Sequence, residues 1–163
     1  MLHADTPLPL AALAHAAQVA YTPAASAIST MEKRGVIRRT RRAGQDEFEP
    51  NRASPYYPMA YATALVDLPL ADALRGQRVL AAYAYGSLAT PGGGTRHSDL
   101  DLMLVGDVKD RAQVTERLEE LGSRLSRQID SFILTPEQFA RAGRRHDEHV
   151  ASALRGVRIF GDV

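Results

Sequence analysis

Apolar residues in the second half of the chain alternate between short runs and segments with helical spacing. The runs predict strands, at residues 79–85, 100–105, 129–134 and 157–160. Residues 111–127 carry valine or leucine at every third or fourth position and predict an amphipathic helix. A capping box with a proline at Thr135 begins another helix, and two short helices are expected before the first strand, at 57–66 and 70–75. This alternation predicts an α/β core.

The first half of the chain predicts two helices followed by a β-hairpin. Residues 10–19 are rich in alanine and form the first helix. The second helix has Thr22 as its cap and Pro23 in its first helical position, and it stops at Gly35, because glycine suits the position just past a helix C-terminus. A glycine-containing loop at 43–45 then joins two hairpin strands, at residues 36–42 and 47–49.

A proline-rich stretch lies between the two halves. Three of the nine residues at 50–58 are proline, which excludes a continuous helix through the stretch. We therefore predict three parts: a first domain at residues 1–52, a linker with packing helices at 53–77, and a second domain at 78–163.

Composition is that of an ordinary globular protein, with 45% hydrophobic and 24% charged residues. The chain has no cysteine, which excludes disulfides and thiolate zinc sites and fits a reducing, cytoplasmic environment. No apolar run is long enough to span a membrane. We do not expect a signal peptide at the start, because no lysine or arginine precedes the apolar run and Pro7 and Pro9 interrupt it.

The pattern with the most chemical information is a glycine-serine turn followed by two aspartates. Gly86 and Ser87 end one apolar run, and Asp99 and Asp101 open the next one after a glycine-rich loop. Residues two apart on a strand share a face, so the two carboxylates would lie side by side. Such carboxylates repel each other unless a cation lies between them, and carboxylates together with substrate phosphates suit Mg²⁺.

This motif resembles the signature of the nucleotidyltransferase superfamily, in its polymerase-β-like, minimal nucleotidyltransferase branch. The match rests on Gly86, Ser87, Asp99 and Asp101. The family usually carries a third carboxylate on a later strand, for which Asp130 is the candidate. The resemblance implies an α/β (α+β) nucleotidyltransferase core with a mixed sheet, preceded here by a small winged-helix-like domain.

The same resemblance implies an activity, in which a nucleoside monophosphate moves from an NTP, most simply ATP, to an acceptor hydroxyl with Mg²⁺ as cofactor. Asp99 and Asp101 would hold the metal ions. Asp130 would bind metal on the acceptor side or take the proton of the attacking hydroxyl. Gly86 and Ser87 would contact the triphosphate.

The sequence leaves several alternatives for the acceptor molecule and for whether the site catalyses the transfer. Antitoxin-type relatives modify a toxin-like protein partner, and other small relatives modify aminoglycoside antibiotics. The family often carries arginine where this chain has Thr90, and Arg96 or His97 could supply the missing charge. Two alternatives come from other classes: a transcriptional regulator that senses a nucleotide without turnover, and an inactive scaffold.

The first half resembles a winged helix-turn-helix domain, with residues 22–34 as the recognition helix and residues 36–49 as the wing. Residues 1–7 are too short and too rich in proline to supply the additional helix with which such domains normally begin. The resemblance implies DNA as a partner and a homodimer on two half-sites. Major-groove contacts would come from Ser26, Ser29, Thr30 and Lys33, and phosphate contacts from Arg38, Arg39, Arg41 and Arg42.

Two histidines three residues apart, His146 and His149, suggest a metal pair. They lie in a run that also holds Arg144 and Arg145, so a solvated polar helix face is the favoured interpretation.

Overall fold

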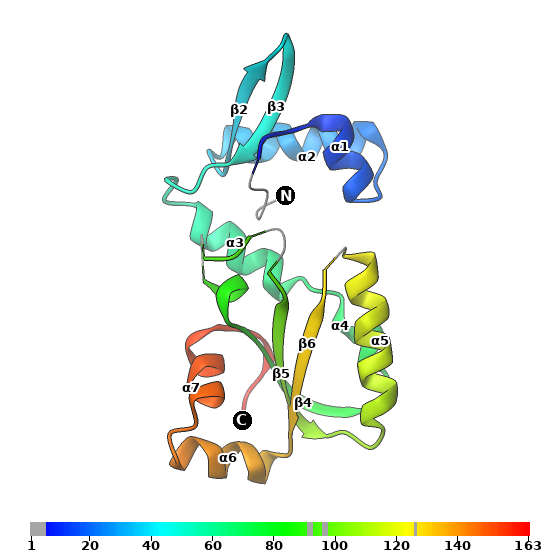
Figure 1. Cartoon of the computed structure of the whole chain (residues 1–163), viewed down its shortest axis with the longest axis vertical. Coiled ribbons are helices and arrows are strands. Elements are labelled where there is room, and N and C mark those ends of the chain that lie inside the picture. Colours follow the sequence, from blue (N-terminus) through cyan, green and yellow to red (C-terminus); the bar gives the residue numbers. More distant parts are fainter. Residues whose placement is uncertain (1–5, 91–92, 96–97, 126) are drawn as a thin grey trace. The chain divides into compact units, whose positions relative to one another are not determined.

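A computed structural model describes residues 6–90, 93–95, 98–125 and 127–163 of the chain (Figure 1). The chain forms two compact units, Met1–Tyr61 and Ala62–Val163. The boundary between the units falls within helix α3, Tyr57–Val66. In the part of the chain that the model describes, no helix is both long and apolar enough to cross a membrane.

The first unit confirms the predicted order of two helices and a hairpin. Its elements are β1 (Leu8–Pro9), α1 (Leu10–Ala16), α2 (Tyr21–Lys33), β2 (Ile37–Arg42) and β3 (Gln45–Pro50). The three strands form an antiparallel sheet in the order β1-β3-β2. Apolar residues from both helices and the hairpin form its core, among them Leu13, Ala24, Ile28, Ile37 and Phe48.

The start of α2 differs from the prediction. Its N-cap is Ala20, and Thr22 lies inside the first turn rather than capping it. Pro23 is therefore the third helical residue. The first four N–H groups of a helix have no partner within the helix, so proline is tolerated throughout this turn and does not mark a single position.

The end of α2 is as predicted, because Gly35 adopts a positive φ of 69° just past the helix. Its N–H donates to the carbonyl of Glu32 at 2.8 Å, and the next N–H, of Val36, donates to Met31 at 3.0 Å. These two bonds form a Schellman motif, which satisfies carbonyls that the helix leaves without partners.

The hairpin turn is one residue shorter than predicted. Gln45 already pairs with Arg42, so only Ala43 and Gly44 form the loop. Both have positive φ, 48° and 81°, as in the two-residue turns whose twist matches that of paired strands.

The second unit alternates strands and helices around a mixed sheet, as predicted. Within it, β4 pairs antiparallel with β5 and β7, whereas β5 and β6 are parallel, in the order β6-β5-β4-β7. After α3 its elements are α4 (Leu70–Ala73), β4 (Arg78–Tyr85), the 3-10 helix η1 (Ser87–Ala89), β5 (Leu100–Asp107), α5 (Arg111–Arg124), β6 (Ile129–Leu134), α6 (Pro136–Arg144), α7 (Glu148–Arg155) and β7 (Val157–Gly161).

Helices cover both faces of this sheet. Figure 1 shows α5 on one side of the strands and α6 with α7 on the other. On the second side, Met103 and Val105 of β5 pack in one buried cluster with Phe139 of α6 and Val150 of α7. The predicted capping box at the start of α6 is present, with Thr135 as the N-cap. Alternate residues of β5 face α5, so the central strand is buried on both sides.

Gly35→Ala should destabilise the first unit by about 1 kcal/mol, because alanine is strained at positive φ. The added Cβ would meet nothing closer than Ser54 Oγ at 3.8 Å, so the loss reports the backbone conformation and not a clash. Gly143→Ala in α6 is the matched control. A Cβ added at Gly143 would meet no atom within 4 Å beyond its chain neighbours and the backbone of its own helix, and alanine should stabilise this helix by about 0.5 kcal/mol. Thermal unfolding of both variants checks the signs, and a neutral Gly35→Ala would contradict the account of the α2 end.

Candidate functional site

A row of polar side chains crosses the sheet on the face that α6 and α7 cover. Asp101 of β5 is opposite Tyr85 of β4 and opposite Asp130 of the parallel strand β6. Side chains in register on neighbouring strands point to the same face, so these three form one row, called the carboxylate row below. Asp99 precedes the strand and is exposed.

Gly86 is packed directly against the carboxylate of Asp101. A Cβ at Gly86 would lie 2.1 Å from Asp101 Oδ2, and the φ of 71° at this residue is itself unfavourable for any other amino acid. Only glycine fits at position 86, because the Asp101 carboxylate occupies the space that a Cβ at this position would need. Ser87 follows as the first residue of η1, with its side chain exposed.

The electrostatic environment of the carboxylate row is unfavourable for negative charge. Burial raises the pKa of Asp101, the carboxylates of Asp130 and Asp99 raise it further, and only His149 opposes the shift. Burial and the same row also raise the pKa of Tyr85, so its phenol keeps its proton at neutral pH. Within the described residues, none of the three aspartates forms an ion pair.

The donor set of the row fits Mg²⁺. In the described part of the chain, no three aspartate, glutamate or histidine side chains are grouped closely enough to form a complete metal site. Mg²⁺ does not require one, because it is usually held by one or two carboxylates together with substrate phosphates and water. Asp101 and Asp130 provide two neighbouring carboxylates, and a cation would relieve the repulsion that raises the pKa of Asp101.

Two residues in the α5–β6 turn fix the carboxylate row and were not predicted from sequence. Gln128 Nε2 donates to Asp130 Oδ1 at 2.8 Å, and the Gln128 carbonyl accepts from the N–H of Leu100 at 2.9 Å. The guanidinium of Arg127 donates to the carbonyls of Thr95, at 3.2 Å, and Ser98. The turn therefore ties the start of β6 to the segment just before β5. In the sequence, the only signal for these two residues is that they immediately precede the strand that carries Asp130.

The glycine-rich loop is partly described. A Cβ at Gly94 would lie 2.4 Å from Leu88 Cδ2, so this glycine packs closely onto η1. Thr90, which stands where the family often has arginine, accepts a backbone hydrogen bond from Gly93 at 2.9 Å. Arg96 and His97, the predicted substitutes for that charge, lie outside the described residues.

The two histidines do not share one helix face. His146 has a positive φ of 56° in the turn between α6 and α7, and Asp147 caps α7. The run is exposed, as predicted, but it is divided between a turn and the start of α7, so it does not form one helix face. His149 instead lies beside Phe132 of β6, with 5.7 Å between ring centroids.

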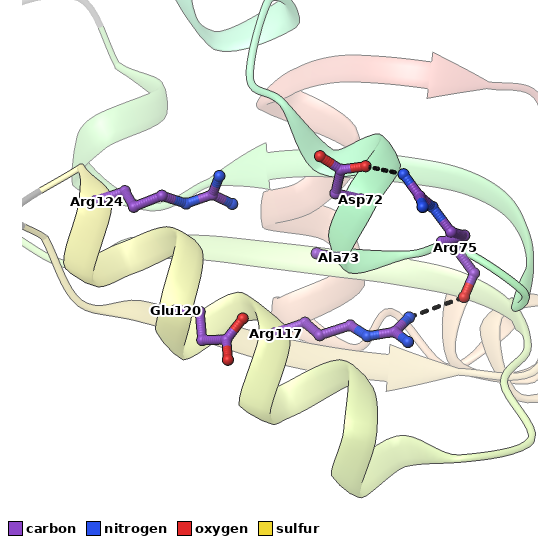
Figure 2. A pocket seen from close by; sticks show the side chains of 6 residues that line it. All are labelled: Asp72, Ala73, Arg75, Arg117, Glu120 and Arg124. Atoms are coloured by element: carbon purple, nitrogen blue, oxygen red, sulfur yellow. Dashed lines mark hydrogen bonds and ion pairs between the residues drawn. The ribbon is translucent and has the colours of Figure 1, made fainter. Parts of the chain in front are cut away.

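Two hollows lie near these elements. A groove of about 540 Å³ reaches Asp130 along the α5–β6 seam, and Ser123, Arg127 and Gln128 line it. A second hollow, of about 360 Å³, lies between α4 and α5 (Figure 2). There Arg117 donates to the carbonyl of Arg75 at 2.9 Å, and Arg75 pairs with Asp72. No residue of the carboxylate row lines this second hollow, so it is not part of the site.

The basic residues of the first unit differ in how far their charge is already neutralised. Arg38 pairs with Glu49 at 2.5 Å. Arg39 pairs with Glu32 at 2.6 Å and with Asp46 at 3.1 Å, and these carboxylates raise its pKa. Among the described residues, the guanidinium groups of Arg41 and Arg42 have no such partner. The other predicted DNA contacts, Ser26, Ser29, Thr30 and Lys33, lie along α2, where the Thr30 hydroxyl donates to the Ser26 carbonyl at 3.0 Å.

No family model and no curated protein matches this chain. Two chains of solved structures are similar to part of it. One belongs to the crystal structure of a mutant of the toxin–antitoxin pair MntA–HpeT. It is 19% identical, the match covers 62% of this chain and 73% of that chain, and the TM-score is 0.41. The other belongs to a tri-AMPylated Shewanella oneidensis HEPN toxin in complex with MNT antitoxin. It is 15% identical, with coverages of 64% and 73% and a TM-score of 0.37.

These likenesses concern the fold alone. The chemistry of the site is therefore argued from the residues of this chain.

Asp101→Asn should raise the melting temperature at pH 7 in buffer that contains a chelator. The pKa of Asp101 lies above its ordinary value, so its ionised form lowers the stability of the fold, and asparagine removes that charge. The cost is full above the raised pKa and absent below the ordinary carboxyl pKa of about 4, so the gain should vanish as the pH falls from 7 to below 4.

Asp107→Asn is the control for this measurement. Asp107 lies at the other end of the same strand, 3.9 Å from Arg78, and its removal should not stabilise the protein. A lower melting temperature for Asp101→Asn at pH 7 would contradict the prediction, because it would show that the ionised Asp101 carboxylate stabilises the fold.

Proposed function

We propose that this chain is a Mg²⁺-dependent nucleotidyltransferase that moves a nucleoside monophosphate from an NTP to an acceptor hydroxyl. The observation that carries the proposal is the packing of Gly86 against the Asp101 carboxylate. The pairing of β5 with β6 places Asp130 beside the same carboxylate. A glycine-serine turn and two carboxylates that form no ion pair with a described residue are thereby brought to one end of the sheet. This arrangement suits a phosphate group that shares a cation with the protein.

Each residue would have a separate task in the reaction. Asp99 and Asp101 would hold Mg²⁺, which when bound offsets the negative charge of the triphosphate. Ser87 would donate its hydroxyl proton in a hydrogen bond to a phosphate oxygen.

Asp130, beside Asp101, would either bind metal on the acceptor side or act as the base for the acceptor hydroxyl. The acceptor oxygen forms a bond to the α-phosphorus as the bond to pyrophosphate breaks, and the hydroxyl proton passes to a carboxylate oxygen. Gln128 occupies Asp130 Oδ1, which leaves Oδ2 for that proton.

The acceptor we propose is a hydroxyl of a protein side chain, with a small-molecule hydroxyl as the alternative. One of the similar structures holds an AMPylated toxin in complex with an antitoxin, in which a protein carries the nucleotide. A sensor that binds the nucleotide without turnover would use the same residues. Release of pyrophosphate from ATP in the presence of an acceptor separates the enzyme from the sensor.

Calorimetric titration of ATP, GTP, CTP and UTP, each with Mg²⁺ and with chelator, tests the nucleotide site. We expect binding that needs Mg²⁺ and is at least about 100-fold weaker in the Asp99→Asn/Asp101→Asn variant, which is about 2.7 kcal/mol. Gly86→Ala should have a similar effect, because its Cβ would displace the Asp101 carboxylate.

Asp107→Asn serves as the control, since it removes one charge from the same strand away from the site. Its binding should equal that of the wild type. If no NTP binds in the presence of Mg²⁺, the proposed function is wrong.

We further propose that the first unit binds nucleic-acid phosphates through Arg41 and Arg42. Both lie at the end of β2, just before the two-residue hairpin turn, and neither guanidinium is paired with a described carboxylate, in contrast to Arg38 and Arg39. Ser26, Ser29, Thr30 and Lys33 of α2 are the proposed base contacts. The helix, helix and hairpin order of this unit is what favours DNA as the ligand.

Fluorescence anisotropy with a labelled mixed-sequence duplex tests this second proposal. Each lost phosphate contact should reduce the slope of log K against log salt concentration by about 0.9, so Arg41→Gln/Arg42→Gln should reduce it by about 2. Arg38→Gln is the matched control, because Glu49 already neutralises that arginine, and the slope should hardly change. Equal effects of both variants, or no binding at low salt, would contradict a role for the hairpin.

A further inference from the structure

An exposed aromatic side chain lies next to the carboxylate row. Phe132, in the middle of β6, is 42% exposed. Its neighbours across the same face are buried: Met103 is opposite it with 0% exposed, and Tyr83 follows with 5%. Large aromatic side chains contribute most to the stability of a fold when they are buried. A solvent-exposed phenylalanine at the end of a buried row therefore needs an explanation.

His149 adds a second ring to this position. The ring centroids of His149 and Phe132 are 5.7 Å apart, with the planes tilted by 42°. The backbone under the imidazole is fixed, because Asp147 Oδ1 accepts from the N–H groups of His149 at 3.0 Å and Val150 at 3.2 Å. The two rings are thus held together by the start of α7, and Phe132 nevertheless remains open to solvent.

The pair is placed within reach of a nucleotide bound at the carboxylate row. Asp130 and Phe132 are two residues apart on one strand, so they share a face and are separated by about 6.6 Å along it. His149 also lies close enough to Asp101 for an electrostatic interaction between the two side chains. A planar group linked through a sugar to a phosphate at the row would meet the open face of Phe132.

We propose that Phe132 and His149 form a stacking platform for the base of the nucleotide substrate. This inference rests on the proposed function, because a triphosphate held at the row is what brings the base to the rings. Every base has a π-face, so the platform would accept all four NTPs and would favour the larger purines. Stacking on an aromatic side chain would contribute on the order of tenfold to affinity.

The absence of tryptophan from the chain makes a direct optical test available. Phe132→Trp introduces a single indole at the platform. Phe160→Trp is the matched control, because Phe160 is 37% exposed on β7, at the opposite edge of the same sheet. Mg·ATP should quench the fluorescence of the Phe132→Trp variant, whereas Mg·tripolyphosphate, which has no base, should not. The Phe160→Trp variant should respond to neither ligand.

Calorimetry on Phe132→Ala and Phe132→Leu provides the second measurement. Both variants should bind Mg·ATP about tenfold more weakly than the wild type and bind Mg·tripolyphosphate equally well. Leucine keeps the apolar contact but loses the ring, so it separates stacking from general apolar burial. Thermal unfolding establishes that each variant is folded.

The two proposals fail in different ways. If Phe132→Ala binds Mg·ATP as the wild type does, or if the wild type binds Mg·ATP and Mg·tripolyphosphate equally, the platform is wrong and the nucleotidyltransferase site stands. If the wild type binds neither ligand in the presence of Mg²⁺, both proposals are overturned.

Discussion

The parallel pairing of β5 with β6 is the constraint on which the candidate site depends. It sets Asp101 opposite Asp130 on one face of the sheet, and the antiparallel pairing with β4 brings Tyr85 and then Gly86 to the same end. The two neighbouring carboxylates repel each other, and burial adds a desolvation cost. The register that builds the site therefore also opposes the stability of the fold at that end.

The same strands supply the stability that this arrangement requires. Immediately below the carboxylate row, Met103 and Val105 are fully buried and pack with Phe139 and Val150 from the covering helices. The electrostatic cost is thus confined to the end of the sheet, where a cation or a phosphate can enter from solvent. Local conflict between charge and burial, next to an otherwise consistent core, is the pattern expected of a functional site.

Local sequence patterns predicted the elements of this unit, because side-chain alternation and helical spacing depend on near neighbours alone. They could not establish which strands pair. That Asp130 lies beside Asp101 follows from the parallel register of β5 and β6, which joins residues separated in sequence by a whole helix. The break in the chain between His146 and His149 could not be predicted for a related reason. Asp147 caps a new helix after a residue of positive φ, and a run of polar residues does not reveal such a break.

For the arginine cluster of the first unit, the sequence likewise does not show which charges are paired with carboxylates. Counted along the sequence, Arg38, Arg39, Arg41 and Arg42 are four equal cations. The hairpin register sets Arg38 opposite Glu49, and Arg39 lies between two carboxylates and over the ring of Phe48.

Charge that is already paired at the surface contributes little to the attraction of a distant polyanion, because the field of each arginine is offset by its neighbour. The part of the cluster that can act on a ligand is consequently the pair beside the turn, Arg41 and Arg42. Arg39 instead joins the hairpin to α2 through its ion pair with Glu32, and Arg38 pairs with Glu49 within the hairpin.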